Sequence, residues 1–122
     1  MIIDKIRDEK EFKKLYDERP MDDGIFTYDF IINNPHLYCF YDETDGSLKT
    51  YANVYEDSGK LFISGASVRK NMPDIINAII TICNAYDKDM YADTDKKEAK
   101  LCLLKAGFKK LEDNLFVRYK HG

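Results

Sequence analysis

Residues 98–108 read EAKLCLLKAGF, and this stretch decides the fold prediction. Its apolar residues recur at the three- and four-residue spacing of a helix that buries one face. Gly107 follows the last residue of that pattern, where a helix commonly ends in a left-handed residue. We expect a helix capped by Thr94 or Asp95 that runs through Lys105. The side chains expected to face the core are Ala99, Cys102, Leu103 and Ala106.

Three strands are predicted upstream of that helix. Aromatic and β-branched residues in short runs predict strands over residues 37–41, 48–55 and 60–68. Turn signals separate these strands at Asp45-Gly46 and at Asp57-Ser58-Gly59. The short spacing of the three strands is typical of an antiparallel meander.

The remaining segments complete a mixed pattern. An isoleucine-rich stretch from Pro73 to about Tyr86 predicts a helix capped by Asn71. Its buried stripe is expected to contain Ile75, Ile76, Ile79, Ile80 and Cys83. Further elements are a strand over 2–6, a helix from the cap Asp8 through Glu18, a short helix around Phe26, Phe30 and Ile31, and strands over 89–93, 108–111 and 115–119. The order β-α-α-β-β-β-α-β-α-β-β predicts an α+β fold with a central, largely antiparallel sheet flanked by helices.

Length and composition are those of a globular domain. The 122 residues are 44% apolar and 34% charged, and we expect a single domain over residues 1–122. No apolar run approaches the roughly 18 residues of a membrane span. The N-terminal residues MIIDK are too short and too charged a segment for a signal peptide. We therefore expect a cytoplasmic protein that does not enter a membrane.

The cysteines predict reduced thiols. Cys39, Cys83 and Cys102 are odd in number and lack the CxxC or Cys/His spacing of a zinc site. Isolated cysteines in an intracellular domain are usually buried and unpaired. We expect no disulfide and no metal site.

Charge is distributed unevenly along the chain. Residues 1–95 hold 11 basic and 19 acidic groups, a net charge of −8, whereas residues 96–122 hold 8 basic and 3 acidic groups, a net charge of +5. Such asymmetry marks either a site for an anionic partner or a solvated helix face. Lysine outnumbers arginine in the basic part and tryptophan is absent, so nucleic acid is not the expected partner.

The order of elements and residues 98–108 together resemble the GCN5-related N-acetyltransferase (GNAT) family over nearly the whole chain. Residues 98–108 are similar to the family segment N-x-x-A-x-x-L-Y-x-K-x-G-F. The resemblance implies a GNAT-like fold and transfer of an acetyl group from acetyl-CoA to an amine. Short GNAT-like proteins encoded by bacteriophages are also similar. That narrower likeness would place the protein in the host-cell cytoplasm or in the virion.

The cofactor loop of the family is not preserved in this chain. Family members hold the pyrophosphate at a Q/R-x-x-G-x-G/A loop before the helix that follows the third meander strand, where backbone N–H groups face the phosphates. The positions equivalent to that loop are Val68, Asn71, Asp74 and Ile76. Asp74 brings a negative charge, Ile76 replaces a glycine, and Pro73 lacks an N–H. Two unit charges about 5 Å apart repel by roughly 3 kcal/mol at an effective dielectric near 20, which lowers affinity about a hundredfold.

The catalytic acid of the family is missing as well. A tyrosine commonly stands four residues before the glycine of G-F, and this chain has Leu103 there. Tyr91 and Tyr86 are the candidates to replace it. The only histidines, His36 and His121, lie in a loop and next to the C-terminus, so no general base is apparent.

We therefore expect a GNAT-fold protein without acetyl-CoA-dependent catalysis and without a cofactor. It would bind a macromolecule, a protein before a nucleic acid, in a structural or host-modulating role. The alternative is a divergent active N-acetyltransferase that uses acetyl-CoA, in which Lys96, Lys97 and Lys100 would contact the phosphates. The sequence leaves homodimer formation open.

Overall fold

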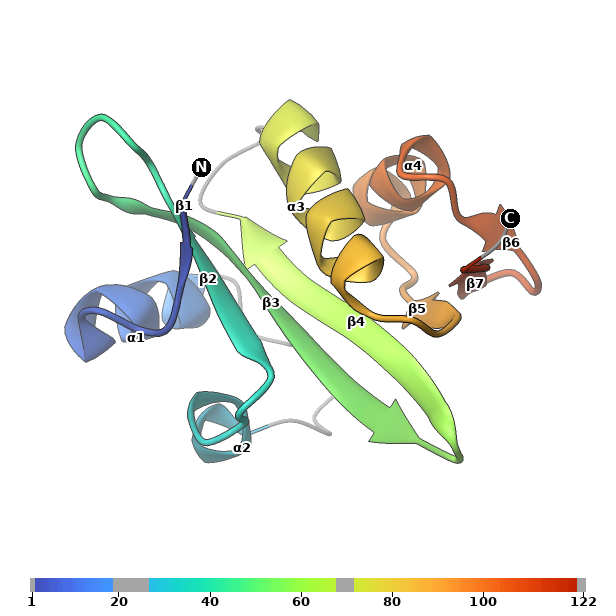
Figure 1. Ribbon diagram of the computed structural model, residues 1–122, viewed down its shortest axis with the longest axis horizontal. Helices are drawn as coiled ribbons and strands as arrows, with labels where there is room; N and C mark the ends of the chain where they lie inside the picture. The colour runs from blue at the N-terminus through green and yellow to red at the C-terminus, as the bar shows by residue number, and fades with distance from the viewer. Residues whose placement is uncertain (1, 19–26, 68–71, 121–122) are drawn as a thin grey trace. The chain divides into compact units, whose positions relative to one another are not determined.

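The computed structural model describes residues 2–18, 27–67 and 72–120. Within these residues there are seven strands and four helices: β1 (Ile2–Asp4), α1 (Glu9–Glu18), α2 (Tyr28–Ile32), β2 (Leu37–Tyr41), β3 (Leu48–Asp57), β4 (Lys60–Ser67), α3 (Met72–Ala85), β5 (Met90–Asp93), α4 (Lys97–Lys105), β6 (Lys109–Lys110) and β7 (Leu115–Arg118) (Figure 1). This is the predicted order of elements. The strands form an open sheet in the spatial order β1-β2-β3-β4-β5-β7-β6.

Pairing in the sheet is mostly antiparallel. The pairs β1–β2, β2–β3, β5–β7 and β6–β7 are antiparallel, whereas β4 and β5 are parallel. A helix, α3, makes the crossover that a parallel pair requires. The predicted α+β class with a largely antiparallel sheet is therefore confirmed.

The chain divides into two compact units. The first comprises Met1–Asn53 and Gly65–Asn71, and the second comprises Val54–Ser64 and Met72–Gly122. Strands β3 and β4 contribute residues to both units. Buried apolar side chains in the first unit include Phe12, Leu15, Ile31, Cys39 and Tyr51, and in the second unit Ile63, Ala78, Ile82, Met90, Phe116 and Val117.

In the first unit, side chains cap both helices at their N-termini. The Asp8 carboxylate accepts hydrogen bonds from the N–H groups of Lys10 at 2.9 Å and Glu11 at 3.5 Å, which confirms the predicted cap of α1. Thr27 Oγ1 accepts from the Phe30 N–H at 3.1 Å and caps α2. The Thr27 cap was not predicted. Of the residues expected in this short helix, Phe26 lies outside the described part of the chain.

In the second unit, helix α4 ends where the sequence predicts. Gly107 has φ +95°, in the left-handed region that glycine adopts without a steric penalty. The Gly107 N–H donates to the Leu104 carbonyl at 3.2 Å, and the Phe108 N–H donates to the Leu103 carbonyl at 3.0 Å. These bonds, with a further one from the Ala106 N–H to the Leu103 carbonyl at 3.1 Å, pair the last carbonyls of the helix. Cys102, Leu103 and Ala106 are buried as predicted, and Ala99 is half-buried.

Two predictions about the helices of the second unit were wrong. The cap of α4 is neither Thr94 nor Asp95 but Lys96, whose side chain makes no capping bond. Thr94 Oγ1 instead accepts from the Lys96 N–H at 3.2 Å. On α3, Cys83 of the predicted stripe is buried as expected, but the other buried residues are Ala78 and Ile82, and the four isoleucines of the stripe are only half-buried. Apolar residues occur nearly all round α3, so periodicity does not define its inward face.

All three cysteines are free and buried, as predicted. Burial raises the pKa of the Cys39 thiol to about 11 and that of the Cys83 thiol to about 11, and it also raises the pKa of Cys102. Thiolates are the reactive form of cysteine, so these groups are expected to be inert in the folded protein.

We expect the raised thiol pKa values to make the protein less stable in alkali. An unfolded cysteine loses its proton near pH 8.5, whereas folded Cys39 and Cys83 keep theirs to about pH 11. The stabilising contribution is therefore complete below about pH 8.5 and is lost as the pH rises toward 11, by up to about 3 kcal/mol per thiol. Urea unfolding between pH 8 and pH 10.5 measures this loss. The Cys39→Ala/Cys83→Ala variant should show a flatter profile, and parallel profiles would contradict the assignment.

Candidate functional site

The residues predicted at the cofactor loop are described only in part. Val68 and Asn71 lie outside the described residues. Asp74 lies in the first turn of α3, which begins at Met72, and Ile76 follows two residues later on the same helix. A carboxylate in the first turn offsets the partial positive charge with which a helix N-terminus attracts anions. Pro73 contributes no N–H to that turn. Both features oppose binding of a phosphate at this helix end.

The structure places the candidate acids on separate elements. Leu103, at the family's tyrosine position, is buried on α4. Tyr91 lies on β5 and contacts Phe62, with ring centroids 5.7 Å apart, and the Lys60 ammonium lies 5.1 Å from the Tyr91 ring centroid. Tyr86 follows the end of α3, where its N–H donates to the Cys83 carbonyl at 3.2 Å. Neither tyrosine occupies the helix position that Leu103 fills.

Tyr91 belongs to a row of aromatic rings. Tyr55 on β3 stacks on Phe62 of β4, with centroids 5.5 Å apart and ring planes 13° from parallel, and Phe62 in turn contacts Tyr91. All three side chains are half-buried. Cross-strand aromatic pairs of this kind stabilise a sheet. Packing within the sheet therefore accounts for the position of Tyr91 without a catalytic role.

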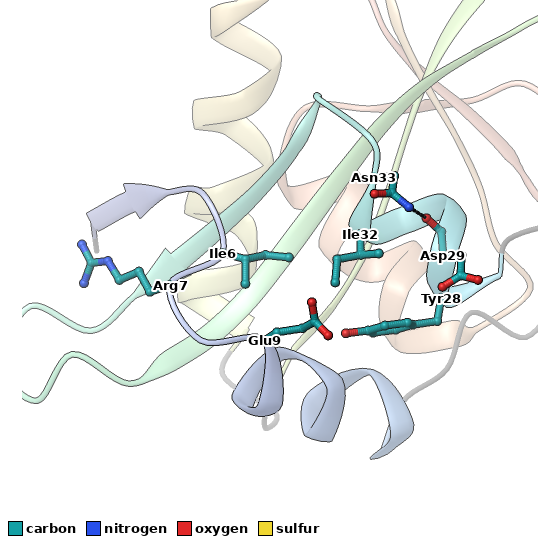
Figure 2. A pocket seen from close by; sticks show the side chains of 7 residues that line it. All are labelled: Ile6, Arg7, Glu9, Tyr28, Asp29, Ile32 and Asn33. Carbon is teal, nitrogen blue, oxygen red and sulfur yellow. Dashed lines mark hydrogen bonds between the residues drawn. The ribbon is translucent and has the colours of Figure 1, made fainter.

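A hollow that the sequence did not predict lies in the first unit. It has a volume of about 650 Å³ and is lined by Ile6, Arg7, Glu9, Tyr28, Asp29, Ile32 and Asn33 (Figure 2). The Glu9 carboxylate and the Tyr28 hydroxyl point toward one another, whereas the Arg7 side chain points away. Asn33 Nδ2 donates to the Asp29 carbonyl at 2.9 Å. The hollow thus combines two apolar walls, at Ile6 and Ile32, with acidic and hydroxyl groups.

Several polar atoms are buried without a hydrogen-bond partner. Within the described residues these are the hydroxyls of Tyr28, Tyr51 and Ser64 and the amide nitrogen of Asn53. Burial, followed by the Glu9 carboxylate, raises the pKa of the Tyr28 hydroxyl, and burial raises the pKa of Tyr51 strongly. Buried polar groups of this kind are usually satisfied by ordered water. The sequence carries no signal for the hollow, because residues 6–9 and 28–33 meet only through tertiary packing.

The remaining predicted groups do not assemble into a site. The His36 N–H donates to Asn34 Oδ1 at 3.0 Å just before β2, and His121 lies outside the described residues. In residues 2–18, 27–67 and 72–120, no three histidine, cysteine or carboxylate side chains are grouped as ligands for a metal ion. None of the described helices has the length and apolar character needed to span a bilayer.

Comparison of the chain with models of protein families, with curated proteins and with solved structures finds no match.

Proposed function

We propose that the protein is a GNAT-like domain that binds a protein partner and does not carry out acetyl-CoA-dependent catalysis. Its support begins with the fold: the observed order of strands and helices is the one that carries the resemblance. The crossover from β4 through α3 to β5 joins the parallel pair of the sheet, Leu61 with Met90 and Phe62 with Tyr91. Ligands commonly bind beyond the carboxyl ends of such parallel strands.

The observation that carries the proposal is the position of Asp74. In a GNAT-like cofactor site the first turn of α3 would face a pyrophosphate, and Asp74 occupies that turn. The helix dipole favours an anion there, but the carboxylate already supplies one. The buried Leu103 provides no proton for a departing thiolate. A helix end that opposes phosphate binding and a missing catalytic acid both favour a domain without acetyl-CoA-dependent catalysis.

Without acetyl-CoA-dependent catalysis, binding of a protein partner is the role that the exposed apolar side chains favour. Large apolar side chains exposed among the described residues are Ile2, Ile3, Phe30, Leu101, Leu104, Leu111 and Tyr119. Single exposed apolar residues are ordinary, but neighbouring pairs indicate contact with a partner. Leu101 and Leu104 form such a pair, because they lie one turn apart on the same side of α4.

We expect calorimetric titration of the full chain with CoA or acetyl-CoA to give no binding at dissociation constants below about 100 μM. The Asp74→Asn variant is the matched control, because it removes the charge and keeps the shape. It should gain affinity for CoA, by up to about a hundredfold if the carboxylate lies near 5 Å from a phosphate.

Two results would overturn the proposal. One is tight binding of acetyl-CoA by the unmodified chain. The other is transfer of its acetyl group to an amine, detected by mass spectrometry, which would establish the alternative of an active N-acetyltransferase. A lack of any gain in Asp74→Asn would show that this carboxylate is not what opposes the phosphates.

A further inference from the structure

Helix α4 carries leucines on both of its faces. Cys102 and Leu103 are buried, whereas Leu101 is 43% exposed and Leu104 is 50% exposed. Residues three apart on a helix are neighbours on one face, so Leu101 and Leu104 form a continuous apolar patch. A helix on the surface of a domain normally presents polar residues on its outward side. Packing inside the domain does not explain these two leucines.

Three lysines and one carboxylate, that of Glu98 one turn before Leu101, lie around this apolar pair. Helical spacing places Lys97 one turn before Leu101, Lys105 one turn after Leu101, and Lys100 one turn before Leu104. Lys97 and Lys105 are exposed and Lys100 is half-buried. No ion pair joins any of the three to a carboxylate in the described part of the chain. We call Lys97, Lys100, Leu101, Leu104 and Lys105 the α4 face.

We propose that the α4 face docks an acidic amphipathic segment of a partner protein. Apolar side chains of the segment cover Leu101 and Leu104, and its carboxylates meet the three lysines. This assignment rests on the proposed role as a protein-binding domain and names the surface and the chemistry of the partner. It also gives a function to the net charge of +5 over residues 96–122, in a chain whose first 95 residues carry −8.

Charge and size favour an acidic protein segment over other anionic partners. An apolar patch of two leucines on a nine-residue helix is small for a membrane anchor, whose strength scales with buried apolar area. A nucleic-acid backbone is bound through its negative charge by lysine and arginine, so binding it would not require the exposed leucines. An amphipathic helix of a partner protein can place its apolar side chains on the two leucines and its carboxylates beside the lysines, so it contacts both kinds of residue on the α4 face.

Selection from a peptide library tests whether the α4 face prefers segments of this chemistry. A phage-displayed library of random peptides is selected on the immobilised full chain. We expect enrichment of peptides with apolar residues at helical spacing flanked by aspartate or glutamate. A synthetic peptide from this selection is then titrated by fluorescence anisotropy. The Leu101→Ser/Leu104→Ser variant and the Lys97→Glu/Lys105→Glu variant should each bind it at least about tenfold more weakly.

Phe30→Ser is the matched control for the leucine variant. Phe30 is 47% exposed, comparable to Leu101 and Leu104, but it lies on α2. This variant should bind the peptide as the unmodified chain does. Thermal unfolding of every variant checks that folding is intact, and binding should weaken as the salt concentration rises.

The inference falls if no peptide is enriched, if the enriched peptides lack acidic residues, or if the leucine variant binds as well as the unmodified chain. It also falls if the α4 face instead binds vesicles of phosphatidylcholine and phosphatidylserine in equal parts, or a DNA duplex, with loss of that binding in Lys97→Glu/Lys105→Glu. CoA titration of the same preparations separates the two proposals. CoA binding refutes the proposed function, whereas failure of the peptide test with no CoA binding refutes only the role of the α4 face.

Discussion

Replacement of Gly65 by alanine is expected to destabilise the protein by about 3 kcal/mol, because the fold leaves no room for a side chain there. A Cβ on Gly65 would lie 2.2 Å from the backbone oxygen of Tyr51 and 3.3 Å from the Cα of Ala52. These are backbone atoms of β3, so they cannot move aside as the end of a flexible side chain would. Overpacking usually costs about 1–3 kcal/mol, and a clash with backbone belongs at the upper end of that range.

Gly46→Ala is the matched control for Gly65→Ala. Gly46 has φ +72° and no atom within 4 Å of an added Cβ, so alanine there is strained but does not clash. The cost of a left-handed alanine is about 1 kcal/mol. Urea unfolding followed by circular dichroism compares the two variants. A loss of less than about 1 kcal/mol in Gly65→Ala, or an equal loss in both variants, would contradict the close approach of β4 to β3 at this position.

Local chemistry explains which parts of the fold the sequence predicts. The cap at Asp8 and the end of α4 at Gly107 depend on hydrogen bonds between residues only a few positions apart. Such bonds form wherever the local sequence allows them, so they are visible in the sequence alone. Residues 37–41 form a strand with the predicted bounds for a similar reason, since the flanking residues are turn formers.

Tertiary packing decides what the sequence does not show. The sequence does not show that Gly65 is required, because the need for glycine comes from the Tyr51 backbone, which packs against this position in the fold. On α3, Ala78 is buried together with Ile82 and Cys83, whereas Ile75, Ile76, Ile79 and Ile80 are only half-buried, although isoleucine is more hydrophobic than alanine. The inward face of a helix that is apolar nearly all round depends on its neighbours. Those neighbours come from elsewhere in the chain.

The candidate site was less predictable than the fold. The family pattern identified Asp74 and Leu103 as departures, and the structure places Asp74 in the first turn of α3 and buries Leu103. The outward leucines of α4 were present in the stretch that decided the fold prediction. Their exposure, however, depends on which face of the helix packs inward. Because positions 103 and 104 are both leucine, the sequence does not show which of the two is buried.

Asn53→Asp is expected to destabilise the protein by several kcal/mol at pH 7. Asn53 on β3 is fully buried, and its Oδ1 accepts a hydrogen bond from Asn34 Nδ2. A carboxylate has nearly the same shape as the amide and keeps an acceptor for Asn34, so steric effects are small. The change adds a negative charge that must leave water. The effective penalty for burying a carboxylate is several kcal/mol even after the protein relaxes.

The effect of Asn53→Asp should depend on pH in a direction that identifies its cause. Burial raises the pKa of the introduced carboxyl above its unfolded value of about 3.9. The penalty is therefore absent below about pH 4, where both states are protonated, and grows as the pH rises toward the folded pKa. Urea unfolding at pH 4.5 and pH 7, each relative to the unmodified chain, should show the larger loss at pH 7.

Asn84→Asp serves as the control for the buried asparagine. Asn84 is exposed, and its Oδ1 accepts from the Arg118 guanidinium at 3.1 Å. A carboxylate at this position stays in water and faces a positive charge, so we expect its stability to lie within about 0.5 kcal/mol of the unmodified chain. If Asn53→Asp behaved like Asn84→Asp, or lost the same stability at both pH values, residue 53 would be reached by water. Its unpaired amide nitrogen would then be hydrated rather than enclosed, because a site that solvates a carboxylate also supplies an acceptor for an N–H group.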